Sequence, residues 1–549
     1  MLTFVTLPVE LVCRIFDHLG DFDLFCSMQN MCYRFNQILD TYHRYQTFTV
    51  LYLPAKSVSK HKVQHLADAL QVNKTLVTLT LECTKIGHQG AQHLADALRI
   101  NTTLTYLNLH GNSIGLQGVQ YLVDALRVNT TLTTLHLHCN QIGEEGGKHL
   151  ADALRVNTTL TNLCLDYNGI GCQGTQHLAD ALRINTTLTN LNLIGNPIGG
   201  KGAQHLADAF RVNKTFMQID IQNKDIGEQG AQYFAETLRV NTTVSVLNLN
   251  GDIRYKGAQH IADALQINRT LTNLKLVGNG IGYEGAQHLA DALRVNTTLT
   301  NLNLLLNKIG NQGTEYLAAA LRVNTTLTEL NLHNNQIGHQ GAQHLADALQ
   351  FNTTLAILNL NYNEIGDEGA LYLANGLRVN NALTTLLFTK NQISETGGQQ
   401  LADALRVNTT LTNLDLDDNA MGVQGIQYLA EALRVNTTLN NLRLLRNEIG
   451  HKGAQHLADA LRNNTALIIL ELAINHIGDQ GTLHLADALR VNTTLATLNL
   501  HCNLIGRQGA QYLADARRLN KVIFILSLFI SNMHVSCVFI RRCCIHTYY

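Results

Sequence analysis

The chain is 549 residues long, carries a formal net charge of −1 and is 45% hydrophobic. That length exceeds what one compact core supports, so we expect several domains or a repeat array. The charge gives no support for nucleic-acid binding or for an acidic membrane surface, and we expect no membrane association. The 11 cysteines lack zinc-ligand spacing and a secreted disulfide framework, which predicts reduced thiols in the cytoplasm or the nucleus. The start of the chain has no basic leader, so we expect no signal peptide.

Residues 6–40 differ from the rest of the chain and predict three short helices. Pro8 suits the first turn of a helix, Gly20 ends that helix, and further helices are expected near Asp21 and from Met31. The stretch resembles an F-box. The residues that carry this resemblance are Leu7-Pro8-Val9-Glu10-Leu11, Ile15-Phe16-Asp17-His18-Leu19, Asp23-Leu24, Cys32-Tyr33-Arg34-Phe35 and Asp40.

The F-box resemblance implies a small all-α domain over residues 1–48 and a partner for it. The family binds the linker subunit of cullin–RING ubiquitin ligases through its first helices. Phe35 stands where tryptophan is frequent in the family. The alternative is that these helices only cap the first repeat, because solenoid ends need shielding from water. The contact residues implied by the resemblance are Leu7, Pro8, Leu11, Ile15, Phe16 and Leu24.

From residue 50 onward one pattern recurs, seen clearly over residues 101–128. Its L-x-L pair returns every 28 residues, with one step of 27 after Leu247. The pattern resembles the leucine-rich repeat of the ribonuclease-inhibitor class, which also occurs in immune receptors of the nucleotide-binding type. The first leucine or isoleucine of each of about 17 units is Leu51, Leu79, Leu107, Leu135, Leu163, Leu191, Ile219, Leu247, Leu274, Leu302, Leu330, Leu358, Leu386, Leu414, Leu442, Leu470 or Leu498.

Each unit predicts one short strand followed by one helix. Residues 105–110 alternate apolar and polar, which directs Leu107 and Leu109 to the core. The family resemblance implies that Asn112 bonds the backbone of neighbouring turns in a ladder. Ala91, Leu94, Ala95 and Leu98 follow the spacing of one buried helix face. We therefore expect an α/β solenoid over residues 49–520, curved, with a parallel inner sheet on the order of 80 Å long and outer helices.

Outward strand positions differ between units whose core positions barely change. This variation favours a recognition surface for a protein substrate, although neutral drift at exposed sites explains it equally well. By register, Asp415 should lie beside Arg443 and Asp418 beside Arg446, as weak surface pairs or as a bipolar patch. The candidate substrate-binding residues are Tyr106, His110, His136, His138, Asp166, Tyr167, Tyr362, Asp415, Asp417, Asp418, Arg443 and Arg446. Two residues of the run Leu304–Leu306 should also leave the core and supply an apolar anchor.

Two recurring features have plain structural explanations. Asn-x-Thr, as at Asn101, follows the repeat period, so we expect the asparagine to end the helix in a left-handed conformation instead of carrying a glycan. The histidines of the helices, such as His93, are expected to be partly exposed and to hold no metal. No phosphate-binding loop or catalytic set appears, so we expect neither a cofactor nor an enzyme.

Two regions depart from the pattern. Around residues 210–256, Lys224 and then Asp252 take the ladder position, one residue is missing after Asp252, and Arg254 replaces a turn glycine. A local change in curvature is expected there. The tail, residues 521–549, contains a largely apolar stretch of 19 residues from Val522 to Ile540, interrupted by Asn532 and His534. A membrane span is conceivable by length, but the preserved L-x-L pair at Leu526 favours a degenerate terminal strand with an irregular end.

The predicted function is that of a substrate-recognition adaptor in an SCF-type cullin–RING ubiquitin ligase. The first alternative is a leucine-rich-repeat scaffold, inhibitor or sensor whose N-terminal helices only cap the array. The second is a regulator of a small GTPase, because some GTPase-activating proteins share this architecture.

Overall fold

The computed structural model describes residues 48–53, 60–223, 225–520, 525–529 and 536–540, with residues 9, 12 and 522. These residues belong to two compact units, Met1–Ile253 and Arg254–Tyr549, which we describe separately. Val9 and Val12 are helical, the first exposed and the second buried. The F-box-like contact candidates Leu7, Pro8, Leu11, Ile15, Phe16 and Leu24 lie outside the described residues.

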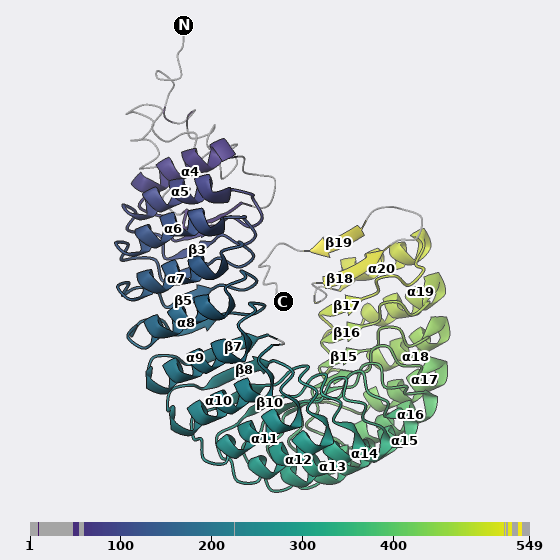
Figure 1. Ribbon diagram of the computed structural model, residues 1–549. Helices are drawn as coiled ribbons and strands as arrows, with labels where there is room; N and C mark the ends of the chain where they lie inside the picture. The colour runs from purple at the N-terminus through teal and green to yellow at the C-terminus, as the bar shows by residue number, and fades with distance from the viewer. Residues whose placement is uncertain are drawn as a thin grey trace. The chain divides into compact units, whose positions relative to one another are not determined.

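In unit 1, strands alternate with helices, and each described strand pairs in parallel with the next strand along the chain (Figure 1). The elements are β1 (Val50–Tyr52), α4 (Lys60–Val72), β2 (Thr78–Thr80), α5 (Gly87–Leu98), β3 (Tyr106–Asn108), α6 (Gly115–Leu126), β4 (Thr134–His136), α7 (Gly143–Leu154), β5 (Asn162–Cys164), α8 (Gly171–Leu182), β6 (Asn190–Asn192), α9 (Gly199–Val212), β7 (Gln218–Gln222), α10 (Gly227–Val240) and β8 (Val246–Asn250).

Unit 2 repeats the same alternation, with parallel pairing from β9 to β18. Its elements are α11 (Arg254–Leu265), β9 (Asn273–Lys275), α12 (Gly282–Leu293), β10 (Asn301–Asn303), α13 (Gly310–Leu321), β11 (Glu329–Asn331), α14 (His339–Leu349), β12 (Ile357–Asn359), α15 (Gly366–Leu377), β13 (Thr385–Leu387), α16 (Glu395–Leu405), β14 (Asn413–Asp415), α17 (Gly422–Leu433), β15 (Asn441–Arg443), α18 (Gly450–Leu461), β16 (Ile469–Glu471), α19 (Gly478–Leu489), β17 (Thr497–Asn499), α20 (Arg507–Leu519), β18 (Ile525–Phe529) and β19 (Ser536–Ile540).

The core of each unit lies between its sheet and its layer of helices. Leu107 and Leu109 are fully buried, as is Leu94 on the predicted helix face. The helices approach one another closely at Gly118, where an added Cβ would lie 3.0 Å from the Cα of His88 in the preceding helix. The helices cover one face of each sheet and leave the other, which we call the inner face, uncovered (Figure 1). The predicted leucine-rich-repeat solenoid is confirmed.

The predicted asparagine ladder is present in both units. Asn140, which is fully buried, accepts the backbone N–H of Asn112 at 3.0 Å through its side-chain oxygen. Its amide nitrogen donates to the carbonyl of Leu109, in the preceding repeat, at 2.8 Å. These bonds satisfy turn groups that would otherwise be buried without partners.

A second ladder was not predicted, and it explains the recurring asparagine of Asn-x-Thr. The side-chain nitrogen of Asn129 donates to Leu98 O at 2.7 Å, at the end of the preceding helix. Its side-chain oxygen accepts the N–H groups of Thr131 at 3.1 Å and Leu132 at 2.8 Å. Asn129 is buried, so its amide is not accessible to a glycan. The expected left-handed conformation is wrong: at the equivalent Asn213, φ is −71° and ψ is 131°, because the side chain makes its turn from extended backbone.

The missing residue of the 27-residue step lies before Gly251, not after Asp252. Gly227 N–H donates to Gly251 O at 2.8 Å, as Gly115 N–H donates to Asn140 O at 2.9 Å in a regular unit. Gly251 therefore occupies the ladder position that we had assigned to Asp252. Arg254 takes the turn-glycine position with φ of 54°, as predicted. Lys224 lies outside the described residues, and the change in curvature stays a prediction.

The tail contains the predicted degenerate strand. In β18, Leu526 pairs with Leu498 of β17 in the repeat register. The end that we expected to be irregular contains a further strand, β19, which pairs antiparallel with β18. No helix among the described residues has the length and apolar character needed to cross a membrane. The domain boundaries at residues 48 and 520 stay a prediction.

Candidate partner-binding surface

The inner face of unit 1 carries a cluster of aromatic rings from β3, β4 and the residues that follow them. The ring centroids of His110 and His138 lie 3.9 Å apart, and those of Tyr106 and His136 lie 5.2 Å apart. His136 and His138 are 5.9 Å apart, which joins the two pairs. We call Tyr106, His110, His136 and His138 the ring cluster. All four were predicted to lie on this face.

Two histidines of the ring cluster, His136 and His138, favour the uncharged imidazole. Burial, and then the proximity of His110 and His136, lowers the pKa of His138 to about 4. Burial also lowers the pKa of His136, against the opposing influence of Glu82. The Nδ1 atoms of His110 and His138 are buried without a hydrogen-bond partner. The lowered pKa values of His136 and His138 therefore keep these two imidazoles uncharged at neutral pH.

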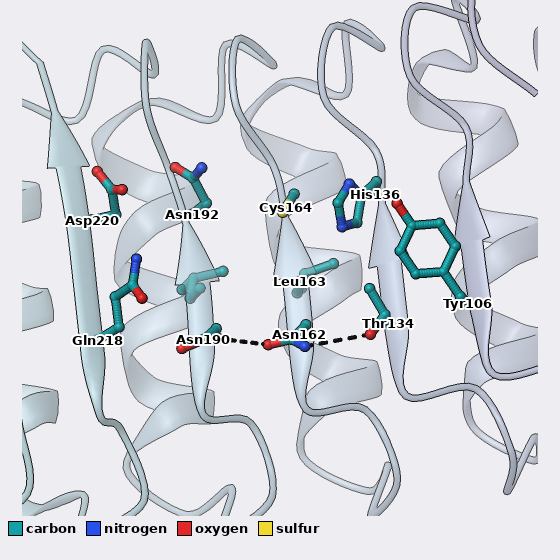
Figure 2. A pocket seen from close by; sticks show the side chains of 11 residues that line it. Tyr106, Thr134, His136, Asn162, Leu163, Cys164, Asn190, Asn192, Gln218 and Asp220 are labelled. Atoms are coloured by element: carbon teal, nitrogen blue, oxygen red, sulfur yellow. Dashed lines mark hydrogen bonds between the residues drawn. The ribbon is translucent and has the colours of Figure 1, made fainter. Parts of the chain in front are cut away.

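A hollow of about 350 Å³ lies beside the ring cluster on β3–β7 (Figure 2). The small side chains of Asn162, Cys164 and Asn190 lie between the larger Tyr106 and Gln218. Asn190 donates to the side-chain oxygen of Asn162 at 2.7 Å, and Asn162 donates to Thr134 Oγ1 at 3.4 Å. This row of amides offers donors and acceptors that suit the backbone of a bound peptide.

Asp166 and Tyr167 follow β5 at the edge of this face. Asp166 accepts the N–H of Ile194 at 3.2 Å. Burial, assisted by Asp220 and opposed by that hydrogen bond, raises the pKa of Asp166 to about 7. Tyr167 is 61% exposed, so its ring is available to a partner.

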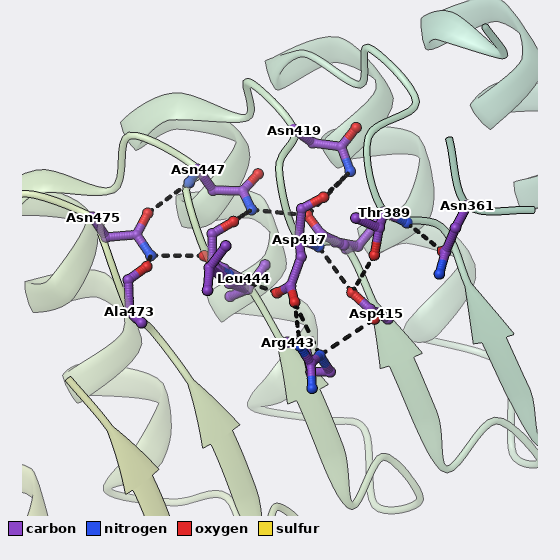
Figure 3. Close-up of polar contacts among 12 residues, drawn as sticks. Asn361, Thr389, Asp415, Asp417, Asn419, Arg443, Leu444, Asn447, Ala473 and Asn475 are labelled. Atoms are coloured by element: carbon purple, nitrogen blue, oxygen red, sulfur yellow. Dashed lines mark hydrogen bonds and ion pairs between the residues drawn. The ribbon is translucent and has the colours of Figure 1, made fainter. Parts of the chain in front are cut away.

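In unit 2, the predicted charged residues form a hydrogen-bonded network (Figure 3). Arg443 contacts Asp417 Oδ2 through Nε at 3.0 Å and Nη2 at 2.6 Å, and it lies 3.3 Å from Asp415. Asp415 also accepts the hydroxyl of Thr389 at 2.9 Å, and Asp417 accepts the N–H of Leu445 at 2.7 Å. The register pairs Asp415 with Arg443 as predicted, but the shorter bonds of Arg443 go to Asp417.

Burial distinguishes the two predicted ion pairs of this region. The side chains of Asp415 and Asp417 are only 11% and 6% exposed, so they are not the surface groups that we expected. Burial and then Asp415 raise the pKa of Asp417, although Arg443 and the Leu445 N–H oppose them. Arg446 and Asp418 form the expected surface pair at 3.7 Å, with 55% and 27% of their side chains exposed.

A second hollow, of about 450 Å³, lies at the loops that follow β13–β16. Lys390, Arg446 and His476 line it, together with Asp418 and Glu448. Tyr362 stacks on His333 with ring centroids 4.8 Å apart, and the Lys390 Nζ lies 5.1 Å from the Tyr362 ring centroid.

The predicted leucine run behaves as expected. Leu304 is fully buried, Leu305 is half-buried, and Leu306 is 48% exposed. Two leucines thus leave the core of unit 2 and offer apolar surface.

Sequence reasoning missed several residues that line the two hollows. They lie at outward strand positions or in the loops that follow strands, so the repeat register was the signal that would have found them. The missed polar residues include Thr134, Asn162, Cys164, Asn190, Asn192, Gln218, Asp220, Lys390, Gln392, Glu448 and His476. Among the described residues, no group of three or more histidines, cysteines or carboxylates is placed to hold a metal ion.

The family model "NLRC3 LRR domain" matches residues 44–386 and 183–500, and the model "Leucine Rich repeat" matches residues 491–514. The chain belongs to the leucine-rich-repeat family. No curated protein matches the sequence. The family assignment covers the two hollows and the ring cluster, but not most of the F-box-like stretch.

Two solved structures are similar to this leucine-rich-repeat chain at low identity. One is the complex of Rad7 and Elc1 in yeast, at 16% identity and a TM-score of 0.43, covering 71% of this chain and 90% of that chain. The other is the complex of TLR13 with ssRNA13, at 17% identity and a TM-score of 0.43, covering 82% of this chain and 68% of that chain. At these values, neither structure says anything about the function of this chain.

Proposed function

We propose that the chain is a non-enzymatic adaptor that brings a protein substrate to an SCF-type cullin–RING ubiquitin ligase. One observation carries this proposal: an F-box-like motif, residues 7–40, directly precedes a leucine-rich-repeat array. In this arrangement the first segment docks the linker subunit of the ligase, and the inner face of the array holds the substrate.

The inner face supports the substrate-binding half of the proposal. Unit 1 offers the ring cluster and a hollow with a row of amides, and unit 2 offers the exposed part of Arg443 over two buried carboxylates. Aromatic residues and arginine are the residue types enriched where binding energy concentrates in protein interfaces. The hydrogen bonds of Arg443 also hold its guanidinium in place before a partner arrives, which reduces the entropy lost on binding.

Binding of the purified linker subunit to the full-length chain tests the ligase-binding half. We expect the wild type to bind and a Leu11→Asp, Phe16→Asp double variant to lose binding, because charge at the apolar contact would be desolvated without a partner. Val9→Asp is the matched control, since Val9 is exposed in the same stretch and the motif leaves that position variable. A folded wild type that fails to bind, or a double variant that binds as well as Val9→Asp, would remove the ligase from the proposal.

A scaffold without a ligase is the second candidate function. It is favoured by the family match, which is to the repeat domain of an NLRC3-type protein. It is also favoured by Val12, which is 1% exposed, as expected of a helix that packs as a cap. Loss of folded repeats when residues 1–47 are deleted, measured by circular dichroism, would support the cap. Full retention of the fold would speak against it.

A further inference from the structure

The ring cluster of unit 1 combines close packing with unsatisfied nitrogen atoms. His110 and His138 are in ring contact, and the Nδ1 atom of each is buried without a partner. A neutral imidazole can leave Nδ1 without a proton, but the charged form carries a proton on both nitrogens. Protonation would therefore bury an N–H donor that has no acceptor, next to a second ring.

The charged groups that face the cluster do not remove this conflict. Glu82, after β2, accepts a hydrogen bond from Asn108 at 2.8 Å. Of the two cluster histidines whose pKa is lowered, Glu82 favours protonation only of His136. Asp166, after β5, is itself disfavoured as an anion by burial. The remaining titratable groups on these strands and the three residues after each are Cys83, Tyr106, Cys139, Cys164 and Tyr167. In this part of the described chain, no lysine or arginine occupies an outward position of β2–β5 or of the two residues after each.

We propose that the ring cluster is an acid-sensitive switch on the inner face of unit 1. At neutral pH the imidazoles of His136 and His138 are uncharged, and the four rings pack together as an aromatic surface. Acid protonates His136 and His138, opens the contact between His110 and His138, and turns the same surface cationic. The inference rests on the proposed function only in treating this face as the partner-binding face.

The direction of the switch follows from linkage. A histidine whose pKa is lowered in the packed state stabilises that state above its ordinary pKa, and the stabilisation is lost as the pH falls. For His138 the window runs from its ordinary value of 6.5 down to about 4. Near pH 5, this shift favours the open state by at most about thirtyfold, and partial exposure of the ring reduces the expected effect to roughly tenfold.

Hydrogen exchange of the intact chain, at about pH 7.5 and about pH 5, measures the opening. After correction for intrinsic rates, we expect exchange in residues 104–112 and 132–140 to accelerate roughly tenfold in acid. Residues 439–447 of unit 2, which contain no histidine, should not change. Equal acceleration in both units, or none in either, would overturn the proposal.

Two variants and one wild-type measurement complete the test. His138→Gln should abolish the acid response, while His177→Gln, a helix histidine outside the cluster, should keep it. A His138→Gln variant that responds like the wild type contradicts the proposal. If His138→Gln does not fold, NMR titration of His138 in the wild type decides, because titration near pH 6.5 instead of below pH 5 would refute the switch. No linker subunit is used, so failure here is separate from failure of the ligase proposal.

Discussion

At the scale of single residues, two asparagines in each regular repeat form hydrogen bonds with backbone groups of that repeat and of the preceding one. The inward asparagine, as at Asn140, was expected from the family pattern, whereas the one at the end of the helix, as at Asn129, looked like a simple terminator. Both asparagines are buried, and both form hydrogen bonds that join neighbouring repeats. Their loss should therefore leave several buried backbone groups without partners.

Asn129→Ala tests the second ladder. It removes the bonds to Leu98 O, Thr131 N and Leu132 N, so we expect destabilisation of about 2–4 kcal/mol, measured as a lower urea midpoint. Thr131→Ala is the control, because it destroys the Asn-x-Thr sequence but spares the main bonds of Asn129. A large effect of Thr131→Ala with little effect of Asn129→Ala would contradict the ladder.

Arg443 and Arg446 differ in burial of their partners, and their alanine variants should differ accordingly. Arg443→Ala leaves Asp415 and Asp417 buried without a guanidinium, so we expect a loss of about 1–3 kcal/mol. Arg446→Ala breaks only an exposed pair at 3.7 Å, worth under about 1 kcal/mol. Urea denaturation of both variants measures the difference, and equal midpoints would mean that the network does not stabilise unit 2.

Asp166 should make unit 1 less stable at high pH. Its pKa is raised from 3.8 to about 7, so the folded state holds a proton that the unfolded state has lost, and stability falls as pH rises through this range. Asp166→Asn should therefore become relatively more stabilising between about pH 4 and about pH 8. Melting temperatures across this range measure it, with Asp152→Asn on an exposed helix position as the control. A pH-independent difference between wild type and Asp166→Asn would contradict the raised pKa.

At the scale of elements, some helices are capped by the preceding helix. Asp479 of α19 accepts the N–H groups of Gly506 at 2.7 Å and Gly509 at 2.9 Å, at the start of α20. Asn311 does the same for α14, at Gly338 and Gly341, and Asp367 does so for α16. The unsatisfied N–H groups at a helix start favour such an acceptor. The capping residue lies in the preceding repeat, which is why the sequence around each helix start did not reveal it.

Asp479→Ala should lower stability by about 0.5–2 kcal/mol, the range of a lost N-terminal cap. The matched control is Asp487→Ala, on the same helix, which removes only an exposed pair with Arg490 at 3.6 Å. We expect faster hydrogen exchange at the start of α20 in Asp479→Ala alone. Unchanged exchange there would show that the bonds to Gly506 and Gly509 do not hold the helix start.

At the scale of the whole molecule, each 28-residue repeat depends on the repeats beside it and not on a central core. Units 1 and 2 contain the same strand–helix repeat, and stability in such arrays approximates a sum of repeat and neighbour terms. Deletion of residues 301–328, one full period within unit 2, should therefore preserve the fold. Deletion of residues 301–314, half a period, should disrupt it, because strand and helix positions would no longer match. Circular dichroism and melting of the two deletions measure this, and similar disruption in both would contradict the repeat model.

The sequence by itself determined the repeat, its register and the buried leucines. A period of 28 residues and an alternating apolar pattern are local properties that every unit repeats, so no long-range information was needed. The outward direction of the ring-cluster residues, of Arg443 and of Leu306 followed from the same alternation.

Only the tertiary structure decided what these residues do to one another. Three features depend on contacts between neighbouring repeats. They are the burial of Asp415 and Asp417, the ring contact between His110 and His138, and the capping of α20 by Asp479. The same holds for the missing residue before Gly251, whose position became clear from its hydrogen bond with Gly227. Distances between side chains of neighbouring repeats depend on side-chain rotamers and on how closely the backbones approach. The pattern of residue types along the sequence contains neither.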